Sequence, residues 1–143
     1  EDFYRYDRWT EVAAMKSGHV KEEYDWVCKS LDDLLASYGY MRDGHLYRAE
    51  QPNTDTIVFF CHFGLGCVLI SHLIGVSPMV LWHGLCAAPT SVATLVTEER
   101  RKGIASFRMG SYGDISHLYV RDEPTAFSAR FCECYDNEEE RHD

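Results

Sequence analysis

A short apolar run that ends in a histidine constrains the fold of this chain more than any other stretch. Residues 56–62 read Thr-Ile-Val-Phe-Phe-Cys-His, and Gly64 follows two positions later. A run of this length that is rich in β-branched and aromatic residues is typical of a strand covered on both faces of a parallel sheet. The sequence therefore predicts a buried parallel strand that carries His62 to the carboxyl edge of a sheet.

The residues after this run predict a helix, because their apolar positions change to helical spacing. Leu65, Leu69 and His72 fall on one face, and Gly75 is expected to end the helix. A helix that begins directly after a strand presents free N–H groups and the positive end of its dipole. Ligands of open α/β sheets bind at this edge. We expect an anion site here. The alternative is that His62 only packs at the end of the strand.

Further segments of the sequence fit a known family when taken in order. The run ending at His62, with Gly64 and the following helix, resembles the second histidine motif of the histidine phosphatase (phosphoglycerate mutase-like) superfamily. Residues 88–95 (Ala-Pro-Thr-Ser-Val-Ala-Thr-Leu) resemble a polar turn and strand of that fold, and residues 113–118 (Gly-Asp-Ile-Ser-His-Leu) resemble its late Asp-x-Ser-His-Leu segment. The resemblance implies an incomplete three-layer α/β/α sandwich with a mostly parallel sheet and an edge hairpin.

This resemblance implies a domain organisation and an activity. Residues 1–143 would form one domain, with helical segments and a small hairpin over 1–55, the central strand, helix and edge strands over 56–118, and a tail over 119–143. The activity would be that of a phosphomonoesterase or phosphomutase that works through a phosphohistidine. It would need no cofactor and would act on a small phosphorylated substrate.

The family's nucleophilic histidine has no counterpart in this sequence. It belongs to an Arg-His-Gly triplet at the end of the first strand, whereas the Arg-His pair of this chain, Arg141-His142, lies in a charged tail. The resemblance then implies that the nucleophile lies upstream and that these residues alone are inactive. The alternative is a noncatalytic family member that binds a phosphorylated ligand or a protein partner.

The resemblance also assigns roles to individual residues. His62 would be catalytic, donating a hydrogen bond to the phosphoryl oxygens, and the backbone N–H groups of Phe63 and Gly64 would bind phosphate. Apart from the resemblance, the sequence offers Ser91, His117, Trp82 and His83 as further candidates to support this site, where Trp82 and His83 could line a substrate pocket and His117 could orient a loop or contact the site directly. Trp82 and His83 have a second interpretation, as a core tryptophan and a histidine hydrogen-bonded at a helix end.

Composition limits the partners. A formal net charge of -9 over 143 residues argues against nucleic acid and against an anionic membrane surface. No apolar stretch approaches the roughly 20 residues that span a bilayer, and the N-terminus lacks the features of a signal peptide. We therefore expect a cytoplasmic protein. An apolar face left uncovered by an incomplete fold would favour a homodimer.

The six cysteines predict no metal site, because structural zinc usually uses paired Cys-x-x-Cys knuckles and the sequence has none. Their apolar surroundings favour free thiols in a reducing compartment. A zinc site remains the alternative, with two ligand sets: Cys61, His62 and Cys67, or Cys132, Cys134 and His142.

The other elements follow from periodicity and turn residues. An apolar stripe predicts a helix over residues 20–38 that Gly39 ends, and Asp43-Gly44 predicts a hairpin over 40–47. A shorter helix is expected over 3–16. Residues 91–98 and 104–109 read as two strands around a charged glycine turn. An aromatic stripe at Phe127, Phe131 and Tyr135 predicts a segment that docks onto the domain or onto a partner subunit.

Overall fold

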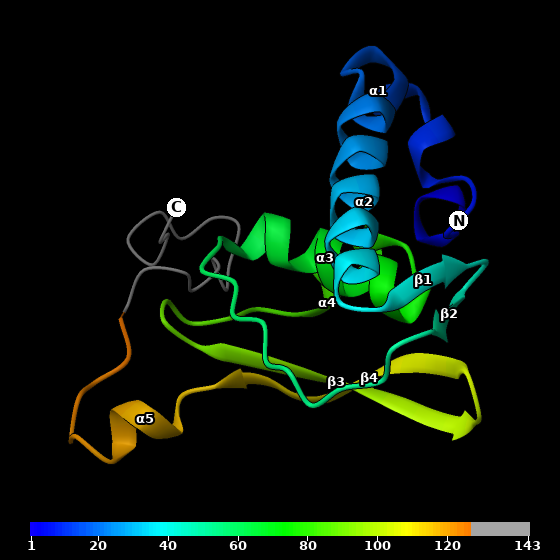
Figure 1. Ribbon diagram of the computed structural model, residues 1–143. Coiled ribbons are helices and arrows are strands. Elements are labelled where there is room, and N and C mark those ends of the chain that lie inside the picture. Colours follow the sequence, from blue (N-terminus) through cyan, green and yellow to red (C-terminus); the bar gives the residue numbers. More distant parts are fainter. Residues whose placement is uncertain (127–143) are drawn as a thin grey trace, which may run out of the picture. The chain divides into compact units, whose positions relative to one another are not determined.

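The computed structural model describes residues 1–126, so the aromatic stripe expected at 127, 131 and 135 lies outside the described residues. The chain divides into two compact units. The first comprises Glu1–Gly84 with Val96–Arg108, and the second comprises Leu85–Leu95 with the chain from Met109 onward. The first unit contains helix α2 (Val20–Ser37) and the hairpin of β1 (Tyr40–Asp43) and β2 (Leu46–Ala49), which are labelled in Figure 1. It also contains the residues 56–64 on which the sequence analysis centred.

Helix α2 (Val20–Ser37) confirms the predicted apolar stripe, which buries Cys28, Leu31 and Leu35. The chain leaves the helix through Gly39, as expected, with a φ angle of +88°. A side chain at this position would be doubly unfavourable, because an added Cβ would lie 2.7 Å from the Cβ of Gln51. The carbonyl oxygen of Gly39 also accepts hydrogen bonds from the backbone N–H groups of Glu50 and Gln51, at 2.9 and 3.3 Å. Gly39 therefore fixes the end of α2 to the end of the hairpin.

The hairpin predicted from Asp43-Gly44 is confirmed by strands β1 (Tyr40–Asp43) and β2 (Leu46–Ala49). The two strands are antiparallel, with Tyr40 opposite Ala49 and Asp43 opposite Leu46. Gly44 has a φ angle of +60°, which L-residues adopt only at a cost and glycine adopts freely. Turn chemistry was sufficient to place this element.

The two strands expected after residue 90 are confirmed as β3 (Val92–Arg101) and β4 (Ile104–Asp114). They belong to a four-stranded sheet with the order β1-β2-β4-β3. Strand β2 pairs with β4 in antiparallel fashion, with Tyr47 opposite Ala105. The prediction of a mostly parallel sheet in an α/β/α sandwich is therefore wrong. The sheet is built from two hairpins, whose consecutive strands run antiparallel, whereas parallel neighbours require long crossover connections.

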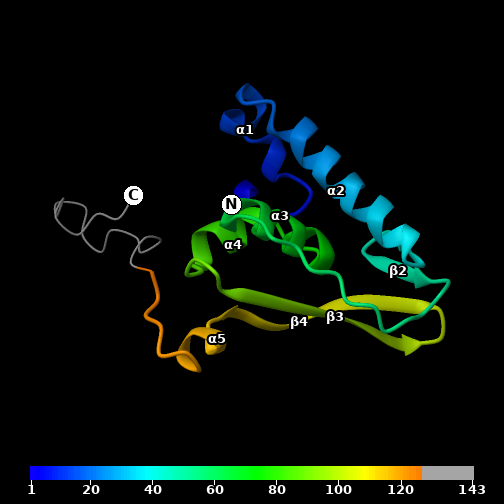
Figure 2. The same cartoon turned by 60° about the vertical axis from the view of Figure 1, so that its left-hand side comes forward.

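The predicted central strand is absent from the sheet. Residues 52–62 form neither a helix nor a strand, and Figure 2 shows them as a drawn-out trace between β2 and α3. We call residues 56–61 the apolar segment. High strand propensity alone could not make it a strand, because a strand also needs a neighbour to receive its backbone hydrogen bonds.

The helix predicted after this segment is confirmed as α3 (Phe63–Ile74), and Gly75 ends it with a φ angle of +75°. A shorter helix, α4 (Pro78–Gly84), packs against it. The N-terminal region differs from the single helix expected over 3–16. It forms the 3-10 turns η1 (Asp2–Tyr4) and η2 (Trp9–Glu11) and the short helix α1 (Ala13–Ser17). Trp9 is fully buried there against the rings of Tyr24 and Trp82.

The hydrophobic core of the first unit lies between α2, α3 and the hairpin side of the sheet. We call α2, α3, β1 and β2 together the helix–hairpin core. The buried members of the central cluster come from α2, β1, β2 and β4, and are Leu31, Leu35, Tyr40, Tyr47, Ala49 and Ala105. Partly buried side chains packed against this cluster include Leu69 and Leu73 of α3 and Ile57 of the apolar segment. The apolar segment is thus attached to the core by one side chain while its neighbours face outward.

Candidate functional site

His62 lies at the start of α3 and its side chain is exposed. Its backbone carbonyl accepts the first helical hydrogen bond, from the N–H of Gly66 at 2.8 Å. Its imidazole makes no hydrogen bond to the start of the helix. Within residues 1–126 the backbone N–H groups of Phe63, Gly64 and Leu65 have no backbone partner. The structure therefore places His62 at a helix N-terminus, as expected, but delivers it from an irregular segment and not from a strand.

Of the residues expected around His62, Trp82 contacts Gly64, one of the two residues predicted to bind phosphate. Its indole Nε1–H donates a hydrogen bond to the carbonyl oxygen of Gly64 at 3.1 Å, which ties α4 to the first turn of α3. An added Cβ at Gly64 would meet no atom within 4 Å. Position 64 is therefore open, and the protein itself does not require a glycine there for lack of space.

His83 is exposed and its Nδ1 lies 3.0 Å from the hydroxyl oxygen of Tyr4. The two rings meet edge to face with their centroids 5.7 Å apart. This contact joins the end of α4 to η1. His83 thus has a structural partner in the first unit, which agrees with the interpretation of a hydrogen-bonded histidine at a helix end.

Ser91 and His117 belong to the second unit. The backbone N–H of Ser91 closes a turn onto the carbonyl of Ala88 at 3.0 Å. His117 is exposed in the one-turn helix α5 (Ser116–Tyr119), whose start is held by a 2.7 Å hydrogen bond from the Ser116 N–H to the Asp114 carboxylate. Both residues therefore sit in local turn structures of their own.

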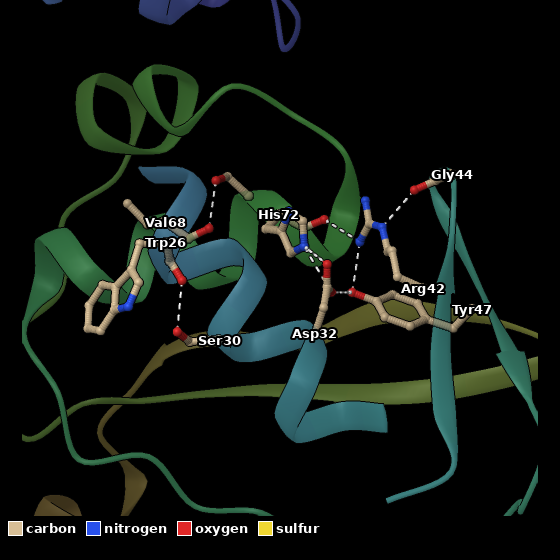
Figure 3. Close-up of polar contacts among 9 residues, drawn as sticks. Trp26, Ser30, Asp32, Arg42, Gly44, Tyr47, Val68 and His72 are labelled. Atoms are coloured by element: carbon tan, nitrogen blue, oxygen red, sulfur yellow. Dashed lines mark hydrogen bonds and ion pairs between the residues drawn. The ribbon is translucent and has the colours of Figure 1, made fainter. Parts of the chain in front are cut away.

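The sequence analysis did not identify the most connected polar group of the first unit, which is shown in Figure 3. It consists of Asp32 on α2, Arg42 on β1, Tyr47 on β2 and His72 on α3, which we call the buried network. The Nε2–H of His72 faces both carboxylate oxygens of Asp32, at 3.0 and 2.9 Å. The Tyr47 hydroxyl donates to Asp32 at 2.9 Å. One carboxylate thus receives donors from two other elements.

Arg42 closes the buried network from the side of the hairpin. Its guanidinium donates to the Tyr47 hydroxyl at 2.7 Å and to the backbone carbonyl of His72 at 3.1 Å, while its Nε–H donates to the carbonyl of Gly44 at 2.6 Å. The guanidinium carbon also lies 5.0 Å from the centre of the Tyr47 ring. Arg42 therefore links the hairpin turn, the second strand and α3.

The electrostatics of the buried network follow from this geometry. Burial by itself would raise the pKa of Asp32, but the hydrogen bond and charge of His72, together with Tyr47 and Arg42, lower it overall. Burial raises the pKa of the Tyr47 hydroxyl, against the opposing effect of Arg42. Asp32 is consequently an ionised acceptor and Tyr47 a neutral donor at neutral pH. Four residues from four elements are held in one charge-assisted arrangement.

The buried network resembles a catalytic His–Asp pair only in part. His72 is 7% exposed, so a substrate has little access to its ring. Its Nδ1 is buried and has no hydrogen-bond partner within residues 1–126. Hollows of about 250 and 240 Å³ occur elsewhere, beside Arg8 and Glu11 in the first unit and beside Leu118 and Tyr119 in the second. We therefore interpret the buried network as a structural group whose polar contacts hold α2, α3 and the hairpin together.

The apolar segment differs from the buried strand that the sequence analysis predicted. Val58 is 67% exposed and Phe60 is 97% exposed, whereas a covered strand would have buried them. In the described part of the chain, no backbone N–H or C=O group of residues 56–61 makes a hydrogen bond. Exposed apolar side chains and a backbone without partners occur together in this one segment. Its sequence had revealed the strand propensity but not the missing neighbour.

The zinc alternatives divide between described and undescribed residues. Among residues 1–126 no group of three or more His, Cys, Asp and Glu side chains is arranged to hold a metal ion. That range includes Cys61, His62 and Cys67, whereas Cys132, Cys134 and His142 lie outside it. Within residues 1–126, Cys28, Cys61 and Cys86 are free thiols. In the same range no helix has both the length and the apolar character needed to cross a bilayer.

Comparisons with protein-family models, with curated proteins and with solved structures find no match to this chain.

Proposed function

We propose that this chain is a noncatalytic protein-binding module that accepts an extended apolar strand of a partner on residues 56–61. The observation that carries the proposal is the combination found in the apolar segment, where exposed Val58 and Phe60 accompany a backbone that makes no hydrogen bond to residues 1–126. A partner strand added to this segment would cover the exposed side chains and pair with the backbone groups. In such complexes main-chain hydrogen bonds supply affinity and alternate side chains supply specificity. This corresponds to the noncatalytic alternative of the sequence analysis.

Two structural features support a binding role for the apolar segment. Ile57 packs against the core cluster, so the segment is held on the domain. Its ends are also fixed. Gly39 accepts hydrogen bonds from residues 50 and 51 before the segment, and α3 begins directly after it. Covering Val58 and Phe60 would contribute about 3–6 kcal/mol in total, at roughly 1.5–3 kcal/mol for each side chain.

A display selection with random ten-residue peptides tests this proposal. We expect enriched peptides with alternating β-branched and aromatic residues, and amide hydrogen exchange at residues 56–61 that slows when such a peptide is bound. The double variant Val58→Lys with Phe60→Lys should lose binding. Val80→Lys is the matched control, because Val80 is an exposed valine of α4 in the same unit. Equal binding by both variants would contradict the proposal.

We propose a second candidate function because the start of α3 has donors to offer. The N–H groups of residues 63–65 have no backbone partner in the described chain, and His62 is exposed beside them. This arrangement would suit an anion. It supports the phosphoryl chemistry implied by the resemblance, with the nucleophile upstream. The small phosphorylated substrate then belongs to the longer enzyme.

Two measurements test the second candidate. Titration with inorganic phosphate should shift the amide signals of residues 63–65, and His62→Ala should weaken the response. Hydrolysis of p-nitrophenyl phosphate should appear only in a version extended upstream to the natural start codon, and should be lost with His62→Ala. Hydrolysis by the 143-residue chain itself would contradict the prediction that its nucleophile is missing. An absence of phosphate-induced shifts would argue against the site.

We further propose a cytoplasmic, reducing location. The support is that, within residues 1–126, Cys61 and Cys86 are exposed free thiols and Cys28 is a buried one. An exposed thiol persists most readily where glutathione and thioredoxin keep cysteines reduced. Fractionation of the source cells with an antibody against the chain tests this location directly.

A further inference from the structure

We infer that the strand bound by the apolar segment is the same segment of a second copy of this chain, paired antiparallel about a twofold axis at Val58. The inference rests on the proposed function, because it names the partner of the same site. It starts from the fact that the segment has both requirements of a strand pair, exposed apolar side chains and free backbone groups.

The pattern of the segment is complementary to itself. A twofold axis perpendicular to the plane of an antiparallel strand pair leaves each face of the pair unchanged. Residues opposite each other across the axis therefore point to the same face, and their numbers are both even or both odd. With Val58 on the axis, Thr56 lies opposite Phe60 of the second copy, and Ile57 lies opposite Phe59. Pairs of aromatic with β-branched residues are among the favourable cross-strand combinations. The outward Val58 and Phe60 of both copies then form one apolar patch.

Charge favours this seam over other surfaces of the chain. The whole sequence has a formal net charge of -9, so two copies repel each other at most approaches. Residues 56–61 include no Asp, Glu, Lys, Arg or His, and Asp55 and His62 flank them at opposite ends. Antiparallel pairing places Asp55 opposite Cys61 of the second copy, next to its His62. Asp55 and the second copy's His62 then point to opposite faces of the strand pair, so no charged side chain lies among the paired residues 56–60.

The backbone at the start of the segment sets the length of the pairing. The N–H of Asp55 is already used in a 3.1 Å hydrogen bond to the side chain of Asn53. At the other end, α3 begins at Phe63. With the axis at Val58, the pairing is thereby confined to residues 56–60, about the usual strand length of 5–6 residues in globular proteins. Each segment remains anchored to its own core through Ile57.

Disulfide trapping tests the position of the axis in the full chain. The background carries Cys61→Ser, Cys86→Ser, Cys132→Ser and Cys134→Ser, which leaves only the buried thiols of Cys28 and Cys67. Val58→Cys should then form a disulfide-linked dimer with itself, because residues opposite each other in a strand pair satisfy disulfide geometry. Thr56→Cys and Phe60→Cys should link when mixed, and each should link poorly alone. Val80→Cys is the exposed control.

Light scattering coupled to size-exclusion chromatography gives the second readout. We expect a concentration-dependent dimer, and Phe60→Asp should raise its dissociation constant about 30-fold or more. A monomer at every concentration would overturn the inference, as would a dimer in which Val58→Cys links no faster than Val80→Cys. Peptide binding by a monomer would leave the proposed function intact and exclude self-pairing. A chain that neither dimerises nor binds peptides would contradict both.

Discussion

The helix–hairpin core and the apolar segment are both rich in aliphatic and aromatic residues, but only the first covers them. Leu35 of α2 is 6% exposed, whereas Phe60 of the segment is 97% exposed. The core also pairs Asp32 with His72, whereas the backbone groups of the segment make no hydrogen bond within residues 1–126. The contrast teaches that apolar sequence becomes core only where neighbouring elements supply both packing and hydrogen bonds.

The largest expected effect comes from breaking the buried network. Asp32→Ala leaves the His72 Nε2–H and the Tyr47 hydroxyl without their acceptor, so we expect a loss of about 2–4 kcal/mol in the free energy of unfolding. Urea denaturation measures it. Asp33→Ala is the matched control, because Asp33 is exposed and paired only with Lys29 at the surface. That change should stay within about 0.5 kcal/mol, and equal effects would contradict the role given to Asp32.

The next effect concerns the backbone that joins the two regions. Gly39→Ala places a Cβ within 2.7 Å of the Gln51 Cβ in a left-handed conformation, so we expect the loss to exceed the roughly 1–2 kcal/mol of the conformation alone. Gly44→Ala is the control with a left-handed φ angle and no atom within 4 Å. Its loss should be confined to about 1–2 kcal/mol. Thermal or urea denaturation compares the stabilities of the two variants. A larger loss for Gly44→Ala than for Gly39→Ala would refute the contact seen at Gly39.

Acid should weaken the core through Asp32. Its pKa is lowered in the folded state, so the unfolded chain binds the proton more tightly and folding is favoured whenever Asp32 is ionised. This contribution is fully present above the unfolded pKa of about 3.9 and is lost as the pH falls through the lower folded pKa. Urea denaturation at successive pH values, with Asp32→Ala for comparison, measures it. The two proteins should converge in stability toward low pH, and a constant difference would contradict this explanation.

The smallest effect is expected in the apolar segment. Phe60→Lys and Val58→Lys remove exposed side chains that bury almost nothing within the chain, so the unfolding free energy of the monomer should change by no more than about 0.5 kcal/mol. Urea denaturation at low protein concentration tests this. Ile57→Lys is the contrasting variant in the same segment. Because Ile57 packs against the core cluster, its substitution should lower the free energy of unfolding clearly more. A large loss from Phe60→Lys would show that the segment belongs to the core after all.

Local signals were sufficient for most elements of the fold. The apolar stripe of α2, the Asp43-Gly44 turn and the glycine that ends α3 each act over a few residues, and all three were confirmed. The sheet was mispredicted because strand pairing depends on neighbours distant in the sequence. A short apolar run reads alike whether a partner strand covers it or not.

The site was harder to predict for the same reason. Asp32 and His72 lie 40 positions apart, and nothing in the pattern of either helix announces their contact. His72 had been placed only as one member of an apolar face. A histidine on such a face requires a hydrogen-bond partner, and the acidic residue next to the buried Leu31 was the available signal.

One consequence of the buried network concerns how the protein can be observed. Because a carboxylate only accepts hydrogen bonds, the Nε2 of His72 carries a proton that it donates to Asp32. Because the His72 ring is 7% exposed, we expect this imidazole proton to exchange slowly with water and to give a resolved NMR signal. His72 thus provides a built-in spectroscopic reporter on the joining of α2 to α3, readable without attaching a label.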